Sequence, residues 1–176
     1  MAFFLTPWIV TIVGWLVHVS LDKSSIKKTK PRVIELLLLW LLVVTGVMGV
    51  IGALGHLGPN SDQVAAEIGF APSMFQWEVG WGDMALSVLL IGCAWKRHRG
   101  YWLTAAVVVL AIQYGGDAIG HIMQYSVHNN TAPNNVWAIP SDILQPIIAI
   151  ILLVIYRRFQ KKGELETPEE PQALAS

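Results

Sequence analysis

The sequence predicts an all-α fold: a polytopic membrane helical bundle with five transmembrane helices. Hydrophobic residues make up 54% of the 176 residues and charged residues only 14%, which is unusual for a water-soluble domain of this size. Five stretches approach the length of about 20 mostly apolar residues that a spanning helix needs. All twelve lysines and arginines fall into three clusters, and each cluster lies next to one of these stretches.

The first two predicted spans, residues 3–20 and 33–56, carry no acidic residue at their centres. The first opens without a basic region or a small-residue cleavage pattern, so we expect a retained helix and not a removed signal peptide. The second carries a row of small residues, including Gly49 and Ala53, which allow close approach of a neighbouring helix in lipid.

The other three spans, residues 74–95, 101–124 and 141–157, contain ionisable side chains. Glu78 and Asp83 lie on the third. On the fourth, Gln113, Asp117, His121 and Gln124 recur every three or four residues and form one polar stripe. On the fifth, Ser141 or Asp142 is a natural N-cap, and Pro146 deprives the Asp142 carbonyl of its helical partner.

The distribution of positive charge predicts the orientation. The basic clusters occupy residues 23–32, 96–99 and 157–162, and the alternate junctions carry no lysine or arginine. Because cytoplasmic loops retain these residues, the N-terminus is expected outside and the C-terminus in the cytoplasm. Residues 1–160 then form a single transmembrane domain. Residues 161–176 are polar and proline-rich and are expected to form a disordered cytoplasmic tail.

The same clusters limit the partners. They are short and lie beside the membrane, so the expected partner is the lipid bilayer and not a nucleic acid. The single cysteine, Cys93, excludes an intramolecular disulfide. A homo-oligomer is left open.

Acidic and histidine side chains gather in the predicted outer halves of the helices. A carboxylate buried in a bilayer is costly without a partner, so these groups are expected to face the bundle interior and share a pocket. Carboxylates and imidazoles together suit a divalent metal ion. The predicted metal ligands are Asp117, His121, Asp83, Glu78 and Asp142, with His56, His128 and Gln113 as secondary candidates.

Each candidate also has a purely structural interpretation. Asp117 and His121 lie one turn apart and can satisfy each other by a hydrogen bond. Glu78 can be an acid favoured by the dipole at a helix start, and Asp142 an N-cap. Asp83 lies too deep in its span for the dipole interpretation, which makes it a stronger functional candidate.

Short motifs lie between residues 78 and 146. They are Glu78-Val79-Gly80, Gly116-Asp117, Gly120-His121, the run Asn130-Thr131-Ala132-Pro133-Asn134-Asn135, and Asp142-Ile143-Leu144-Gln145-Pro146. This stretch resembles a family of small bacterial multi-pass inner-membrane proteins whose function is not established, loosely similar to DoxX-like four-helix membrane proteins. The resemblance implies a bacterial inner membrane and a polar loop packed over the outer pocket. It implies no activity.

Three functions fit these observations. The favoured one is an outward-facing intramembrane pocket that binds a metal cation or a proton-coupled small solute. The second is a membrane-embedded enzyme that performs metal-dependent or acid–base chemistry on a lipid or quinone. The third is a structural or accessory subunit whose buried acids lock helix packing. The identity of any cofactor is unknown from the sequence, a divalent metal ion being the candidate.

The orientation can be tested with reporter fusions. A reporter of cytoplasmic location fused after Lys162 should be active, and a reporter of external location inserted near Asn130 should also be active. Exchanging the two reporters is the control, and both exchanged fusions should be silent. The opposite pattern would reverse the orientation.

Overall fold

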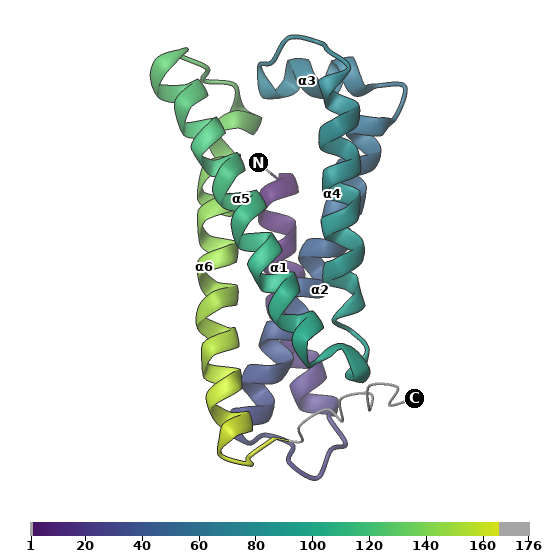
Figure 1. The fold of residues 1–176 in the computed structure, drawn as a ribbon, viewed down its shortest axis with the longest axis vertical. Helices are drawn as coiled ribbons and strands as arrows, with labels where there is room; N and C mark the ends of the chain where they lie inside the picture. Colours follow the sequence, from purple (N-terminus) through teal and green to yellow (C-terminus); the bar gives the residue numbers. More distant parts are fainter. Residues whose placement is uncertain (1, 166–176) are drawn as a thin grey trace, which may run out of the picture.

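The computed structural model describes residues 2–165. Within them the chain forms five long α-helices, one short α-helix and one 3-10 turn. The long helices run roughly along one axis, and the short helix α3 lies across one end of the bundle (Figure 1). The elements are α1 (Ala2–Leu21), α2 (Lys30–Leu57), α3 (Ser61–Ile68), α4 (Phe75–Gly92), η1 (Lys96–His98), α5 (Tyr101–Val127) and α6 (Pro133–Lys161).

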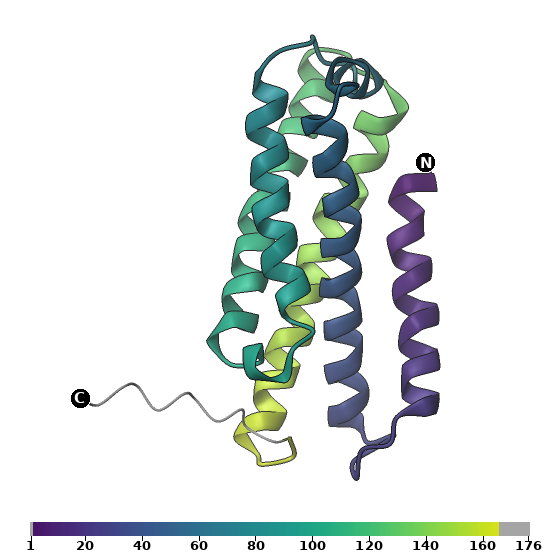
Figure 2. The same ribbon diagram turned by 90° about the vertical axis from the view of Figure 1, so that its right-hand side faces the viewer.

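Helix α2 is the centre of the bundle. It packs most extensively against α4 and also contacts α1 and α6, while α5 packs mainly against α6. Helix α1 lies at the edge, alongside α2 (Figure 2). The tightest apolar packing includes Leu38 and Leu42 on α2, Leu90 on α4 and Leu110 on α5. These residues belong mostly to the half of the bundle that contains η1, so the half beneath α3 is less densely filled.

Four of the described helices, α1, α2, α5 and α6, are long and apolar enough to cross a membrane. Helix α4 lies beside α2 over its 18 residues, but it carries Glu78 and Asp83 and is not one of the four. An all-helical fold is therefore confirmed. The count of five spans and the orientation of the termini stay predictions.

The outer surface of the bundle is apolar. Helix α1 exposes Ile9, Val13 and Leu16 to more than half of their full extent, and α5 exposes Ile112 to 71%. Contiguous apolar surface of this kind is rare on proteins surrounded by water, whereas lipid tails solvate it. The surface is thus compatible with a membrane protein.

Residues 57–73, which connect the second and third predicted spans, contain the short helix α3. One helix boundary differs clearly from the sequence prediction. Helix α6 begins at Pro133 and not near residue 141, so Asp142 lies inside the helix and the N-cap interpretation of Asp142 is wrong. Pro133 occupies the first turn, where its missing N–H has no helical acceptor to lose. Of the predicted tail, residues 161–165 are described, and Lys161 still belongs to α6, whereas residues 166–176 lie outside the described residues.

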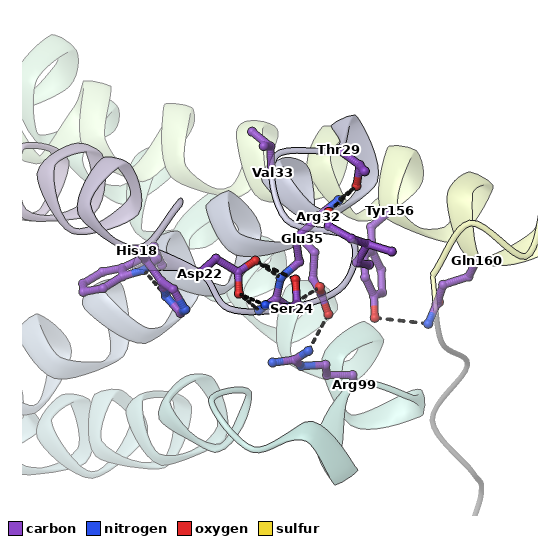
Figure 3. Close-up of polar contacts among 12 residues, drawn as sticks. His18, Asp22, Ser24, Thr29, Arg32, Val33, Glu35, Arg99, Tyr156 and Gln160 are labelled. Atoms are coloured by element: carbon purple, nitrogen blue, oxygen red, sulfur yellow. Dashed lines mark hydrogen bonds and ion pairs between the residues drawn. The ribbon is translucent and has the colours of Figure 1, made fainter. Parts of the chain in front are cut away.

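At the end opposite α3, partly buried ion pairs connect three segments of the chain (Figure 3). Glu35 is 6% exposed, and its two carboxylate oxygens accept from Arg32 Nη1 at 2.7 Å and Arg99 Nη1 at 2.5 Å. Arg32 also donates to Asp22 through Nε at 2.8 Å and Nη2 at 3.2 Å. We call these four residues the cationic-end network. It joins the α1–α2 loop to α2 and to the η1 turn.

The network has consequences for the protonation of Asp22, which lies in the loop after α1. The hydrogen bonds from the Arg32 guanidinium hold the pKa of the Asp22 carboxyl well below its ordinary value. A carboxyl with a lowered folded-state pKa contributes stability above its unfolded pKa, and this contribution is lost only as the pH falls through the folded value. The network should therefore survive mildly acidic conditions.

A further arginine fastens α6 to the same end. Arg157 Nη2 donates to the Gly100 carbonyl at 2.6 Å and to Thr104 Oγ1 at 2.8 Å, and its Nη1 donates to the Arg99 carbonyl at 3.1 Å. The carbonyls at the start of α5 thus share one guanidinium on α6. Helix α4 is joined at this end as well, because its Leu89 carbonyl accepts from Trp102 Nε1 at 2.9 Å and its Gly92 carbonyl lies 2.8 Å from His98 Nδ1. Every long helix therefore contributes to, or adjoins, a fixed polar contact at this end.

Replacing Glu35 should destabilise the fold. In Glu35→Gln the charges of Arg32 and Arg99 stay buried without their shared anion, so the free energy of unfolding should fall by roughly 3–5 kcal/mol. Titration of the purified protein with sodium dodecyl sulfate, followed by circular dichroism, measures this. Glu164→Gln, the same change at an exposed position, should alter stability by less than about 0.5 kcal/mol. Equal stability of the two variants would contradict this role of Glu35.

Candidate functional site

The half of the bundle beneath α3 encloses a cavity of about 660 Å³. Its walls come from α2, α4, α5 and α6, its roof from α3 and the segment after it, and one side from the start of α1. Helices α4 and α5 meet near η1 and diverge toward α3, which leaves the space between them (Figure 1). The cavity therefore lies at the opposite end of the molecule from the cationic-end network.

The cavity has an acidic wall. Asp83 from α4, Asp117 from α5 and Asp142 from α6 all line it. Two histidines, His56 and His121, line it as well, and no lysine or arginine is among its described lining residues. Acidic side chains from three separate helices thus line the same cavity. We call Asp83, Asp117, Asp142 and His121 the acidic cluster.

Within the cluster, Asp83 is fixed by an amide. Gln113 Nε2 on α5 donates to Asp83 Oδ1 on α4 at 2.5 Å, across the gap between the two helices. Asp83 is partly buried. A carboxylate can accept several hydrogen bonds, and the bond from Gln113 satisfies only part of this capacity. Gln113 is a secondary candidate from the sequence, and its role here is to position Asp83.

His121 is held in one tautomer by Asn135, which is fully buried on the first turn of α6. The Asn135 amide nitrogen donates to the carbonyls of His121 at 3.3 Å and Asn130 at 3.0 Å. The Asn135 Oδ1 atom lies 2.8 Å from His121 Nδ1 and must accept there, so Nδ1 carries the proton. The other ring nitrogen, Nε2, faces Asp142 Oδ2 at 3.9 Å.

Asp117 differs from its neighbours because its carboxylate has no hydrogen-bond or ion-pair partner among residues 2–165. The expected hydrogen bond to His121 is not formed, since the ring of His121 is turned toward Asn135 and Asp142. Asp117 is instead exposed, and it lines the cavity. It is the member of the cluster most available to a ligand.

Three other candidates are not members of the acidic cluster, although one of them, His56, lines the same cavity. His56 lines the cavity, and its Nδ1 lies 2.6 Å from Gln76 Oε1 at the start of α4. Glu78 is exposed in the first turn of α4 and is not a lining residue, which agrees with its dipole interpretation. His128 is exposed at the C-cap of α5 and is also absent from the lining.

The roof is fastened by an asparagine that the sequence suggested only as part of a polar loop. Asn130 Nδ2 donates to the Ile68 carbonyl at 2.9 Å, and its Oδ1 accepts from the Ala132 amide at 3.1 Å. Gly69, at the C-cap of α3, has a φ of 82° and packs against this side chain, which leaves no room for a Cβ. Phe70 follows and stacks on His121 with a centroid separation of 6.2 Å.

The floor of the cavity holds a chain of uncharged hydrogen bonds whose members were not predicted from the sequence to line a site. Thr45 Oγ1 donates to Gln145 Oε1 at 2.7 Å, and Gln145 Nε2 donates to Ser141 Oγ at 2.7 Å. All three residues are buried and line the cavity. The only sequence signal for them is polarity in an apolar span, which is costly in lipid and marks positions that face the interior.

The geometry does not assemble a metal centre. Among the described residues, no group of three or more His, Cys, Asp or Glu side chains is placed to hold a metal ion. His121 and Asp142 approach each other, while Asp83 is occupied by Gln113. The metal site therefore stays a prediction.

These features define a class of protein: an all-helical bundle with helices able to cross a membrane and an acidic cavity in one half. The chain belongs to the DUF6790 family, a family of unknown function whose model matches residues 1–162. Comparison with curated proteins and with solved structures gives no match. The likeness to DoxX-like proteins stays a prediction.

Removal of the Asn135 amide should release His121. In Asn135→Ala the Nδ1–H of His121 and two backbone carbonyls lose their partner, so the free energy of unfolding should fall by about 1–3 kcal/mol. The ¹⁵N chemical shifts of the His121 ring should also change from a single Nδ1–H tautomer to a mixture. Asn134→Ala, the same change at the next and less buried position, should leave both unaltered. An unchanged ring spectrum in Asn135→Ala would contradict the assignment.

Proposed function

We propose that this protein binds a small organic solute with a cationic group, such as an amine, in the cavity beneath α3. It would do so as a bacterial inner-membrane protein with five spans, an external N-terminus and a cavity that faces outward. The observation that carries the proposal is the meeting of Asp83, Asp117 and Asp142, from three helices, around one space without a lysine or arginine.

The charge balance supports a cationic ligand. Four carboxylates, those of the three aspartates and of Glu67, line the cavity together with two histidines. The nearest fixed cations of the fold belong to the opposite end. Negative charge within a span is costly when nothing neutralises it. A bound cation or protons must therefore balance the cluster, and exchange between the two would couple binding to proton release.

The size of the cavity favours an organic cation over a bare metal ion. A volume of about 660 Å³ is within the range of pockets for small organic ligands. Much of its lining is apolar, including Phe70, Phe75 and Leu86, which suits the hydrocarbon part of an amine. The lack of a three-ligand group among the described residues points the same way.

One observation favours an alternative, acid–base catalysis on a lipid or quinone. The Nδ1–H of His121 is held by Asn135, and its free Nε2 faces Asp142. This is the arrangement of a base whose tautomer is fixed by a hydrogen-bonded neighbour. Binding without turnover of the bound molecule distinguishes the amine-binding proposal from this one.

Neutralising single carboxylates should weaken amine binding. Saturation-transfer NMR on protein in nanodiscs can measure the affinity for butylammonium. Asp117→Asn and Asp142→Asn should each weaken it roughly 10- to 100-fold, the loss expected for one charge-assisted contact. Lowering the pH until the carboxylates are protonated should have the same effect.

Two controls make the result specific. Asp62→Asn is the same change at an exposed position on α3 outside the lining and should leave the affinity unchanged. The neutral probe 1-butanol should bind the unmodified protein more weakly than butylammonium. Equal binding of the two probes would contradict the proposal. Stoichiometric metal in the purified protein, lost in both Asp117→Asn and His121→Ala, would replace it with the metal-site prediction.

A further inference from the structure

A second, smaller cavity of about 310 Å³ lies between α1 and α6, on the outside of the bundle. Its lining is almost entirely apolar: Leu5 and Trp8 come from α1, and Trp137, Leu144 and Ile148 come from α6. The two helices barely touch, because α1 packs along α2. We call this space the lateral groove.

The lateral groove and the acidic cavity share wall residues. Phe4 on α1 and Ser141 on α6 line both spaces. On α6, Trp137, Ser141, Leu144 and Ile148 follow helical spacing and form the groove face. Asp142 and Gln145 occupy the adjacent face, which lines the acidic cavity. Ser141 is thus the seam between an acidic interior and an apolar, lipid-facing surface.

We propose that the lateral groove holds the hydrocarbon tail of an amphiphile whose cationic head lies in the acidic cavity. This proposal rests on the proposed function and specifies its ligand: a single-chain amine delivered from the lipid. Charge complementarity places the head, because the carboxylates lie on one side of the seam. The apolar lining places the tail, because the groove lies on the apolar, lipid-facing surface of the bundle.

The groove has a length suited to an alkyl chain. From Ser141, where the head would enter the acidic cavity, to Ile148 the axis of α6 rises roughly 10 Å, at about 1.5 Å per residue. A tail lying along it would pass beside Leu5 and Trp8 of α1. A bilayer already solvates hydrocarbon, so the tail gains little free energy from the groove. A test of the groove proposal must therefore measure where the tail lies, because the binding affinity would change little.

Photocrosslinking can locate both ends of the ligand in the full-length protein in nanodiscs. One dodecylamine probe carries a diazirine on the carbon chain close to the amine, and a second carries it at the end of the chain. The head probe should label residues of the acidic cavity on α4 and α5. The tail probe should label the α1 and α6 segments that line the groove, and excess dodecylamine should suppress both signals.

Two variants test the groove. Leu5→Trp fills it and should reduce groove labelling by the tail probe at least threefold while leaving head labelling intact. Ile12→Trp, the same type of change at a lipid-exposed position of α1 outside the groove, should leave both signals unchanged. Asp117→Asn should reduce head labelling and groove labelling together.

The outcomes separate the two proposals. Head labelling that depends on Asp117, combined with tail labelling spread over all lipid-facing helices, would overturn the groove proposal and leave the proposed function standing. Head labelling that is unchanged in both Asp117→Asn and Asp142→Asn would overturn the proposed function and the groove proposal with it.

Discussion

A charge inside an apolar medium needs a counter-charge, and the two ends of this bundle differ in whether the protein itself supplies one. At the cationic end, Glu35 is held between Arg32 and Arg99, and Asp22 completes the neutralisation of Arg32. At the other end, Asp83, Asp117 and Asp142 have amides and imidazoles as neighbours but no arginine or lysine around their cavity. At one end the charges are paired within the protein, and at the other the carboxylates have no arginine or lysine partner among the described lining residues.

The density of side-chain packing also differs between the two ends of the bundle. Near η1 the helices converge on buried leucines and on the contacts of Arg157 with the start of α5. Toward α3 the divergence of α4 and α5 opens the acidic cavity (Figure 1). Firm packing at one end allows space at the other, because the hydrogen bonds and ion pairs of the cationic end hold the helices in place. A cavity in a loosely held bundle would collapse.

Uncharged amides organise the open end. Asn135 sets the tautomer of His121, Asn130 fastens the end of α3 over the cavity, and Gln113 fixes Asp83. Each amide satisfies donors and acceptors without adding charge. The amides therefore hold Asp83 and His121 in defined positions without supplying a counter-charge to the acidic cluster.

The sequence by itself determined the helical class, the approximate position of each long helix and the set of acids that belong to one end. These depend on apolar run length and on the distribution of Lys and Arg, which are local properties of the chain. It did not locate the start of α6, because Pro140 and Pro146 resemble helix boundaries and are accommodated inside the helix. It also missed the pairing of Glu35 with Arg99, which lie far apart in the sequence.

Only the tertiary structure decided which candidates share a space. Asp83, Asp117, His121 and Asp142 come together, while Glu78 and His128 do not, because the direction of a side chain around the bundle depends on helix order and rotation. The hydrogen-bond partner of His121 could not be predicted from the sequence either. The one-turn spacing on α5 suggested Asp117, but Asn135 on α6 holds the ring. Helical periodicity describes neighbours on one helix, and contacts between helices are set by packing.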